Sequence, residues 1–123
     1  MELSALVVEG DANVRNVHKD LLRLVGNCTT VNSGLQAVIL HRMGKRFDVI
    51  LMDMDLPQLE GIRATNELRV MGVRSLILGM SRSCSKEEVR SRERIMVEDA
   101  IDVHYTKPLT AEQLEEALEM LDS

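Results

Sequence analysis

The fold is decided by the stretch Phe47-Asp48-Val49-Ile50-Leu51-Met52-Asp53, which Leu56-Pro57 and Gly61 follow closely. Its apolar centre has the length of a buried strand. Its last residue, Asp53, is an acid at the point where the chain leaves that strand. In an open parallel α/β sheet, ligand chemistry gathers at the carboxyl ends of the strands. We therefore predict that Asp53 lies at the functional edge of such a sheet.

Apolar runs alternate with helical patterns along the rest of the chain. Strands are expected at residues 3–9, about 28–31, 48–53, 75–80 and 101–105. Continuous apolar strands between amphipathic helices call for a parallel sheet that is covered on both faces. We predict one α/β domain over residues 1–123, a five-stranded parallel sheet of the doubly wound (βα)5, flavodoxin-like type. The short and polar second strand is expected at an edge of the sheet.

The helices are predicted from capping residues and from apolar spacing. The expected helix starts are Asp11, Ser33, Glu60, Ser85 and Thr110, and Gly72 is expected to end the third helix. The apolar faces are expected to be Val14, Val17, Leu21, Leu22 and Val25 in the first helix, Leu35, Val38, Ile39 and Met43 in the second, Ala64, Leu68 and Met71 in the third, and Leu114, Leu118 and Leu121 in the last. The helix opened by Ser85 has few apolar positions, so we expect it to be the least securely packed.

Composition limits the classes of function. The net charge is -5 and no Lys/Arg run forms a basic stripe, which argues against a nucleic-acid partner. No apolar segment approaches the roughly 18 residues of a membrane span. Cys28 and Cys84 form no disulfide framework and predict reduced thiols. We expect a monomer or weak dimer in the cytoplasm, with the nucleus as a second compartment.

The motifs together carry a resemblance to a known family. Residues 47–61, with Ser81 and Lys107-Pro108 at matching distances, resemble the receiver domain of two-component response regulators over essentially the whole chain. The sequence of residues 52–57 and 71–75 is most similar to that of plant single-domain (type-C-like) receivers and of hybrid-kinase receivers.

The resemblance implies a site and partners. Asp53 would accept a phosphoryl group from a histidine phosphotransfer protein or a histidine kinase. Lys107 would contact a phosphoryl oxygen as a compact cation, and the hydroxyl of Ser81 would act as the conformational switch. Glu9, Asp53 and Asp55 would be the ligands of Mg²⁺, a cation that prefers oxygen. Such a module is not an enzyme in the usual sense.

The first loop departs from the family pattern. Receivers place two adjacent acids after the first strand, and the second of them binds the cation directly, whereas this chain has Glu9 and then Gly10. The loss of the second acid predicts weaker cation binding and slower phosphotransfer. Asp11 either replaces that acid through a shifted loop or only caps the first helix, and capping is the favoured interpretation.

Other departures lie near the switch position. Arg82 follows Ser81 where the family has a small residue, and we expect its side chain to point into solvent. His104 stands three residues before Lys107, where the family has its switch aromatic, and is expected to be packed and partly wet. His18 and His41 are expected to be surface residues.

Two other functions compete with an active receiver. A pseudo-receiver would bind phosphotransfer proteins without accepting phosphate well, because Gly10 weakens the cation site. A phosphohydrolase of the haloacid dehalogenase type would use Asp53-Met54-Asp55, but that motif should end the first strand rather than the third. A flavodoxin-like cofactor site is rejected, because residues 9–12 are acidic where a flavin phosphate needs hydroxyls and free amides.

Overall fold

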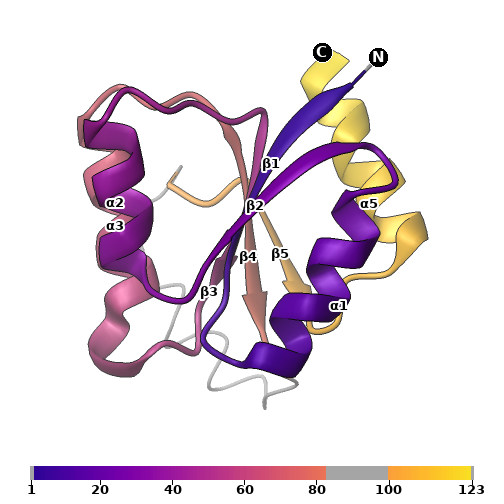
Figure 1. Ribbon diagram of the computed structural model, residues 1–123, viewed down its shortest axis with the longest axis horizontal. Helices are drawn as coiled ribbons and strands as arrows, with labels where there is room; N and C mark the ends of the chain where they lie inside the picture. Colours follow the sequence, from indigo (N-terminus) through magenta and orange to yellow (C-terminus); the bar gives the residue numbers. More distant parts are fainter. Residues whose placement is uncertain (1, 83–99, 123) are drawn as a thin grey trace.

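The core of the molecule is one parallel sheet (Figure 1). The computed structural model describes residues 2–82 and 100–122. Within them the strands are β1 (Leu3–Val8), β2 (Gly26–Val31), β3 (Val49–Asp53), β4 (Leu76–Ser81) and β5 (Val103–Thr106). Their order is β2-β1-β3-β4-β5, and every pair is parallel. The predicted sheet is confirmed, including the edge position of β2.

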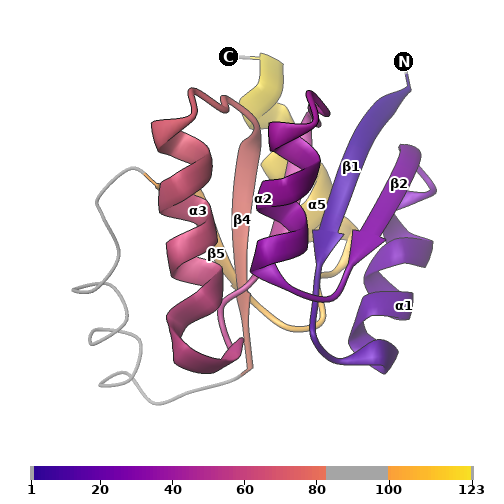
Figure 2. The ribbon, with the colours of Figure 1, turned by 60° about the vertical axis from the view of Figure 1, so that its left-hand side comes forward.

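Helices cover both faces of this sheet. The described helices are α1 (Ala12–Leu22), α2 (Gly34–Arg42), α3 (Glu60–Val70) and α5 (Ala111–Leu118), with short 3-10 turns at Pro57–Leu59 and Glu119–Asp122. Figure 1 shows α1 and α5 on one face and α2 and α3 on the other, and Figure 2 shows α2 and α3 side by side. The doubly wound architecture is therefore confirmed. The helix predicted from Ser85 lies outside the described residues.

The central strand β3 explains why its sequence is apolar throughout. All five of its residues are buried. Val49 and Leu51 belong to the core under α1 and α5, whereas Ile50 and Met52 belong to the core under α2 and α3. Successive side chains of a strand point to opposite faces, so a strand that is covered on both sides has no polar face.

The register of the sheet brings the strand ends together. Val8 pairs with Met52, Asp53 with Met80, and Ser81 with Thr106. The residues that end these strands or directly follow them, Glu9, Asp53, Ser81 and Lys107, therefore share one edge of the sheet. This juxtaposition follows from parallel pairing, as the sequence predicts.

The predicted caps are present at three helix starts. Asp11 accepts from the backbone N–H groups of Asn13 and Val14 at the start of α1. Thr110 and Gln113 form the reciprocal capping box of α5. Ser33 accepts from the N–H of Gln36, but the Gln36 side chain accepts from the N–H of Asn32 rather than that of Ser33.

The predicted apolar face of α2 is wrong. Leu35, Ile39 and Met43 are 61%, 43% and 72% exposed, and only Val38 of that set is buried. The helix packs instead through Gly34, Ala37, Val38 and His41. The physical reason is a close approach to α3, because a Cβ added at Gly34 would lie 2.9 Å from the Cβ of Ala64.

Two further residues of the predicted faces are corrected. Val17 in α1 and Leu121 after α5 are both exposed, whereas both were expected to face the core. The buried residues of α1 are His18 and Leu22, so the helix turns His18 rather than Val17 toward the core.

Arg69 ties α3 to the two neighbouring connections. Its guanidinium donates to the carbonyl oxygens of Val73, Ser75 and Ala100 and to the carboxylate of Asp102, at 2.9–3.0 Å. These bonds give a charged donor to backbone acceptors before β4 and before β5.

Replacing Arg69 by Met is expected to lower the free energy of unfolding by roughly 2–3 kcal/mol, since several partly buried acceptors lose a charged donor. Urea unfolding followed by circular dichroism measures this loss. The matched control is Arg42→Met, which removes an ion pair to Glu67 whose side chains are 60% and 45% exposed and should cost less than about 0.5 kcal/mol. Equal losses in the two variants would contradict this account of Arg69.

Candidate functional site

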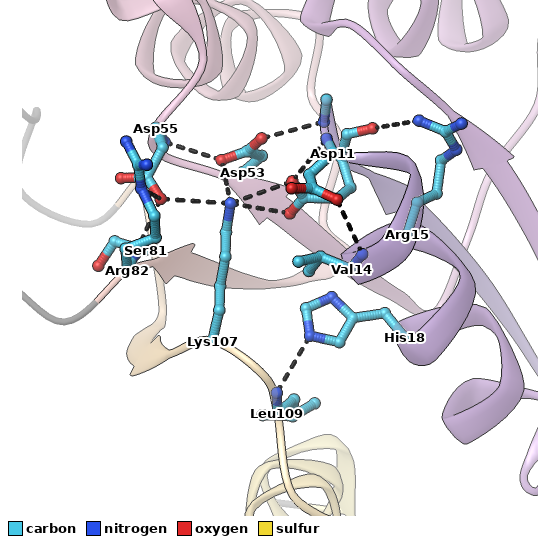
Figure 3. A network of polar contacts seen from close by, with 12 residues as sticks. Asp11, Val14, Arg15, His18, Asp53, Asp55, Ser81, Arg82, Lys107 and Leu109 are labelled. Atoms are coloured by element: carbon cyan, nitrogen blue, oxygen red, sulfur yellow. Dashed lines mark hydrogen bonds and ion pairs between the residues drawn. The ribbon is translucent and has the colours of Figure 1, made fainter.

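A cleft of about 310 Å³ opens at the carboxyl edge of the sheet. Its lining includes Glu9 and Gly10 after β1, Asp53 and Asp55 at the end of β3, and Lys107 after β5. Figure 3 shows the labelled side chains of Asp53, Asp55 and Lys107 pointing toward one another. The predicted acid and amine are therefore close together, as parallel pairing requires.

The ammonium group of Lys107 lies at the centre of the cleft. Its Nζ is 2.6 Å from Asp53 Oδ1 and 2.9 Å from Glu9 Oε1. The same nitrogen is 3.2 Å from Asp55 Oδ2. The side chain of Lys107 is only 7% exposed, so three carboxylates surround one nearly buried cation.

Backbone donors complete the environment of Asp53. The N–H of Asp55 donates to Oδ1 at 2.8 Å, and the N–H of Gly10 donates to Oδ2 at 3.0 Å. These bonds fix the carboxylate in one orientation. Oδ2 accepts one hydrogen bond and Oδ1 accepts two, so Oδ2 is the less engaged oxygen.

The protonation states follow from these contacts. Burial acts to raise the pKa of Asp53, but the hydrogen bonds from Lys107 and Gly10 outweigh it and hold the pKa below its usual value. Burial acts to lower the pKa of Lys107, but the hydrogen bonds to Asp53 and Glu9 outweigh burial and raise this pKa above its usual value. Asp53 is thus an anion and Lys107 a cation at neutral pH.

Glu9 differs from Asp53. Burial, with the neighbouring charge of Asp53, raises the pKa of Glu9 to about 7 despite the opposing hydrogen bond from Lys107. Two carboxylates that share one cation in a buried site do not ionise equally easily. Glu9 is therefore the carboxyl group of the pair that takes up a proton near neutral pH.

Asp11 lines the cleft, but its carboxylate is engaged at the start of α1. Its Oδ1 caps α1, its side chain is exposed, and its own N–H donates to Glu9 Oε2 at 3.1 Å. The capping interpretation is therefore confirmed. At Gly10, by contrast, an added Cβ would lie 3.1 Å from Leu56 Cδ2 and 3.6 Å from Asp53 Oδ2, so a side chain at this position would stand beside the Asp53 carboxylate.

Arg82 lies at the rim of the cleft (Figure 3). Its backbone N–H donates to Asp55 Oδ2 at 2.8 Å, and its Nε is 3.7 Å from the same oxygen. The side chain is 83% exposed, which confirms that it points into solvent.

Ser81 lies at the same edge but does not bond to Asp53. Its side chain is buried, and its Oγ is 2.9 Å from His104 Nε2. The half-buried packing of His104 agrees with the prediction, but sequence reasoning missed this hydrogen bond. The signal that could have found it is the matching position of the two residues, both close to the carboxyl ends of the neighbouring strands β4 and β5.

Comparison with known proteins places this cleft in a family. Residues 5–119 match the family model of the response regulator receiver domain. The chain belongs to the response regulator receiver domain family. The two-component response regulator ARR22 of Arabidopsis thaliana is 36% identical over 110 residues, 88% of this chain and 75% of the relative. Two-component response regulator 24 of the same plant is 34% identical, covering 98% of this chain and 85% of the relative.

Solved structures agree with this assignment. The receiver domain of the Pseudomonas aeruginosa sensor histidine kinase PA1611, solved with a magnesium ion in its active-site cleft, superposes with a TM-score of 0.81 at 27% identity over the full length of both chains. A CheY-like receiver domain from Methylobacillus flagellatus gives a TM-score of 0.74 at 25% identity, over 98% of this chain and 99% of the other. Receiver domains are signalling modules rather than conventional enzymes, and they work with histidine kinases. None of the described helices is long and apolar enough to cross a membrane.

No preformed metal cage is present among residues 2–82 and 100–122 of this receiver domain. No three His, Cys, Asp or Glu side chains there are arranged to hold an ion. The ammonium of Lys107 lies between Glu9, Asp53 and Asp55 instead. A cation that used these oxygens would have to displace part of the Lys107 network.

The prediction that His18 is a surface residue is wrong. Its ring is 1% exposed, and its Nε2 accepts from the backbone N–H of Leu109 at 3.0 Å. This bond fixes the turn that follows Lys107 against α1 (Figure 3). Because the two residues are 91 positions apart, local sequence gives no indication of the contact.

The prediction for His41 is also wrong. The ring is 1% exposed, its Nδ1 lies 2.7 Å from the carbonyl oxygen of Ala37, and it packs edge-on against Phe47 with ring centroids 5.5 Å apart. It is buried on the inward side of α2, where its ring packs on Phe47 from the segment that leads into β3.

His18 should make stability depend on pH. Burial, with the positive charge of Lys107, lowers the pKa of His18 from 6.5 to about 4, so the unfolded chain binds the proton first. The stabilisation is complete above about pH 6.5 and is lost as the pH falls toward 4. We expect the unfolding free energy to fall by on the order of 2–3 kcal/mol more in the parent protein than in His18→Gln over this range.

Urea unfolding at a series of pH values measures this difference. Carboxylate titration is common to both proteins, so subtracting one curve from the other isolates the histidine. Parallel curves for the two proteins would contradict the buried, neutral state of His18.

Proposed function

We propose that this chain is a phosphoryl-accepting receiver in a histidine-to-aspartate phosphorelay, with Asp53 as the acceptor. The observation that carries the proposal is the contact between Asp53 Oδ1 and Lys107 Nζ at 2.6 Å in a cleft of the carboxyl edge. It supports a carboxylate that is ionised, oriented and accompanied by a cation. Those are the requirements for in-line attack on a phosphoryl donor.

The transfer forms one bond and breaks one. A carboxylate oxygen of Asp53 attacks the phosphorus of a phosphohistidine, an acyl phosphate forms, and the P–N bond breaks with its electron pair left on the imidazole of the donor. We assign the attack to Oδ2, because Oδ1 already accepts from Lys107 and from the N–H of Asp55. Positioning and charge neutralisation, rather than covalent chemistry by other residues, supply the acceleration.

Lys107 and Ser81 would serve the transferred group. The ammonium would move from a carboxylate oxygen to a phosphoryl oxygen, which carries more charge. Ser81 would donate its hydroxyl to another phosphoryl oxygen and so couple the cleft to β4 and β5. The phosphoryl group adds about -1.5 to -2 charges, which is enough to re-order the hydrogen bonds around it.

Mg²⁺ is the cation that the family relation brings into the proposal. Glu9, Asp53 and Asp55 would hold it, and it would neutralise charge on the transferring phosphoryl group. These carboxylates offer the oxygen ligands that Mg²⁺ prefers, but the acid that the family has at the position of Gly10 is missing. We therefore propose a cation site of reduced affinity.

The partner that fits this role is a histidine phosphotransfer protein or a histidine kinase. The donor must present a phosphohistidine to a cleft whose rim carries Arg82, Pro57 and Asp11. We propose a monomer or weak dimer that acts in the cytoplasm, with the nucleus as a second compartment.

A pseudo-receiver is the second candidate, and two observations favour it. Gly10 removes one cation ligand, and Lys107 already pairs with Glu9, Asp53 and Asp55. Such a protein would bind phosphotransfer partners while accepting phosphate poorly. The haloacid dehalogenase alternative gains no support, because Asp53 and Asp55 lie at the end of β3, the third strand of the chain.

Incubation with acetyl phosphate and excess Mg²⁺ tests the acceptor. We expect intact-mass analysis to show a gain of one phosphoryl group that is absent in Asp53→Asn, because the amide is no nucleophile. The matched control is Asp20→Asn, an exposed acid on α1, which should keep the gain. If no gain occurs at any Mg²⁺ concentration, the pseudo-receiver is the better description.

Gly10→Asp should strengthen Mg²⁺ binding by about tenfold or more, because it adds a carboxylate next to Asp53, with the added Cβ 3.6 Å from Asp53 Oδ2 and a small shift of the Leu56 side chain, whose Cδ2 lies 3.1 Å from it. Isothermal titration calorimetry with Mg²⁺ measures the affinity. The control Asn13→Asp adds the same charge at an exposed position of α1 and should change affinity by less than about threefold. Equal gains in the two variants would show that only net charge matters.

A further inference from the structure

We propose that His104 is a positioning residue that holds the hydroxyl proton of Ser81 away from Asp53 until a phosphoryl group arrives. The inference rests on the proposed acceptor role of Asp53 and deepens it. It assigns a role to His104 on the basis of its direct hydrogen bond to the Ser81 hydroxyl, a contact that the sequence does not predict.

The direction of the hydrogen bond follows from the surroundings of Ser81. Ser81 is 3% exposed, and its Oγ lies 2.9 Å from His104 Nε2. Within the described part of the chain, this is the one hydrogen bond that the Ser81 side chain makes. If the imidazole donated, a buried hydroxyl proton would have no acceptor, which is costly. Ser81 is therefore the donor, and His104 Nε2 is the acceptor.

Gly79 provides the space that makes this contact possible. Gly79 and His104 are direct partners in the β4–β5 register. A Cβ at Gly79 would lie 3.3 Å from His104 Cδ2 and 3.3 Å from Met54 Cγ. Because Gly79 has no side chain, the imidazole can lie across β4 beside Met54. From there it reaches Ser81, two positions after Gly79 in the same strand.

The hydroxyl cannot serve two acceptors at once. A serine has a single O–H proton, and in this structure the hydrogen bonds to Asp53 come from Gly10, Asp55 and Lys107, not from Ser81. A phosphoryl oxygen is charged and accepts more strongly than a neutral imidazole. Phosphorylation of Asp53 and the Ser81–His104 bond therefore oppose each other, and the coupling acts in both directions.

Removing the acceptor should release the hydroxyl. His104→Phe keeps a ring over Gly79 but cannot accept, so Ser81 would be free to donate to the incoming phosphoryl group. We expect phosphorylation of Asp53 by acetyl phosphate to become about 3- to 10-fold faster, the range that corresponds to one net hydrogen bond.

A double-mutant cycle separates this role from a general effect on structure. The rate is measured by intact mass in the parent protein, His104→Phe, Ser81→Ala and the double variant. We expect the acceleration by His104→Phe to disappear when Ser81 is alanine. Tyr105→Phe, the next residue of β5, is the matched control and should leave the rate within about twofold.

Two results would overturn the proposal: an unchanged or slower rate in His104→Phe, or the same acceleration with and without the Ser81 hydroxyl. If His104→Phe does not fold, His104→Met also removes the acceptor and decides the same question.

If the parent protein and all variants take up no phosphate, the acceptor role of Asp53 fails, and the hydrogen bond is then tested by urea unfolding of the same four proteins. A midpoint shift in the double variant that is smaller than the sum of the single shifts supports the bond. Additive shifts would overturn it.

Discussion

The ammonium group of Lys107 must be paired, because an isolated charge that is almost fully removed from water is too costly to maintain. Glu9, Asp53 and Asp55 supply the pairing from the ends of β1 and β3, so one cation joins three carboxylates that would otherwise repel one another. Buried ion pairs of this kind contribute little net stability compared with apolar packing. The arrangement therefore fits the proposed phosphoryl transfer to Asp53 better than a role in fold stability.

The position of Lys107 depends on elements that are distant in sequence. The sheet register places the end of β5 beside β4, and the backbone N–H of Lys107 donates to the carbonyl oxygen of Ser81 at 2.7 Å. The buried ring of His18 fixes the residue two positions further on. The proposed coupling of Ser81 to His104 uses the same pair of strands, so Lys107 and the Ser81 hydroxyl are both positioned by β4 and β5.

Much of this arrangement could be predicted from the sequence, and the reasons for the errors are physical. Strand-length apolar runs that end in Glu9, Asp53 and Ser81 predict the sheet edge correctly, because burial on both faces demands such runs. The predicted apolar face of α2 is wrong because this helix packs through small residues such as Gly34. The importance of Gly34 is evident only from its close approach to α3. The buried histidines were missed because their partners or packing neighbours lie on other elements of the fold.

The central claim is that Lys107 binds Asp53 as an anion while Glu9 takes up a proton near neutral pH. The most direct test is a carbon-13 NMR titration of the two side-chain carboxyl groups in protein that is free of divalent cations. The account predicts that Glu9 titrates near pH 7 and that Asp53 titrates below the usual pH for an aspartate. Titration of both groups at ordinary carboxyl values, as in an open and hydrated loop, would contradict it.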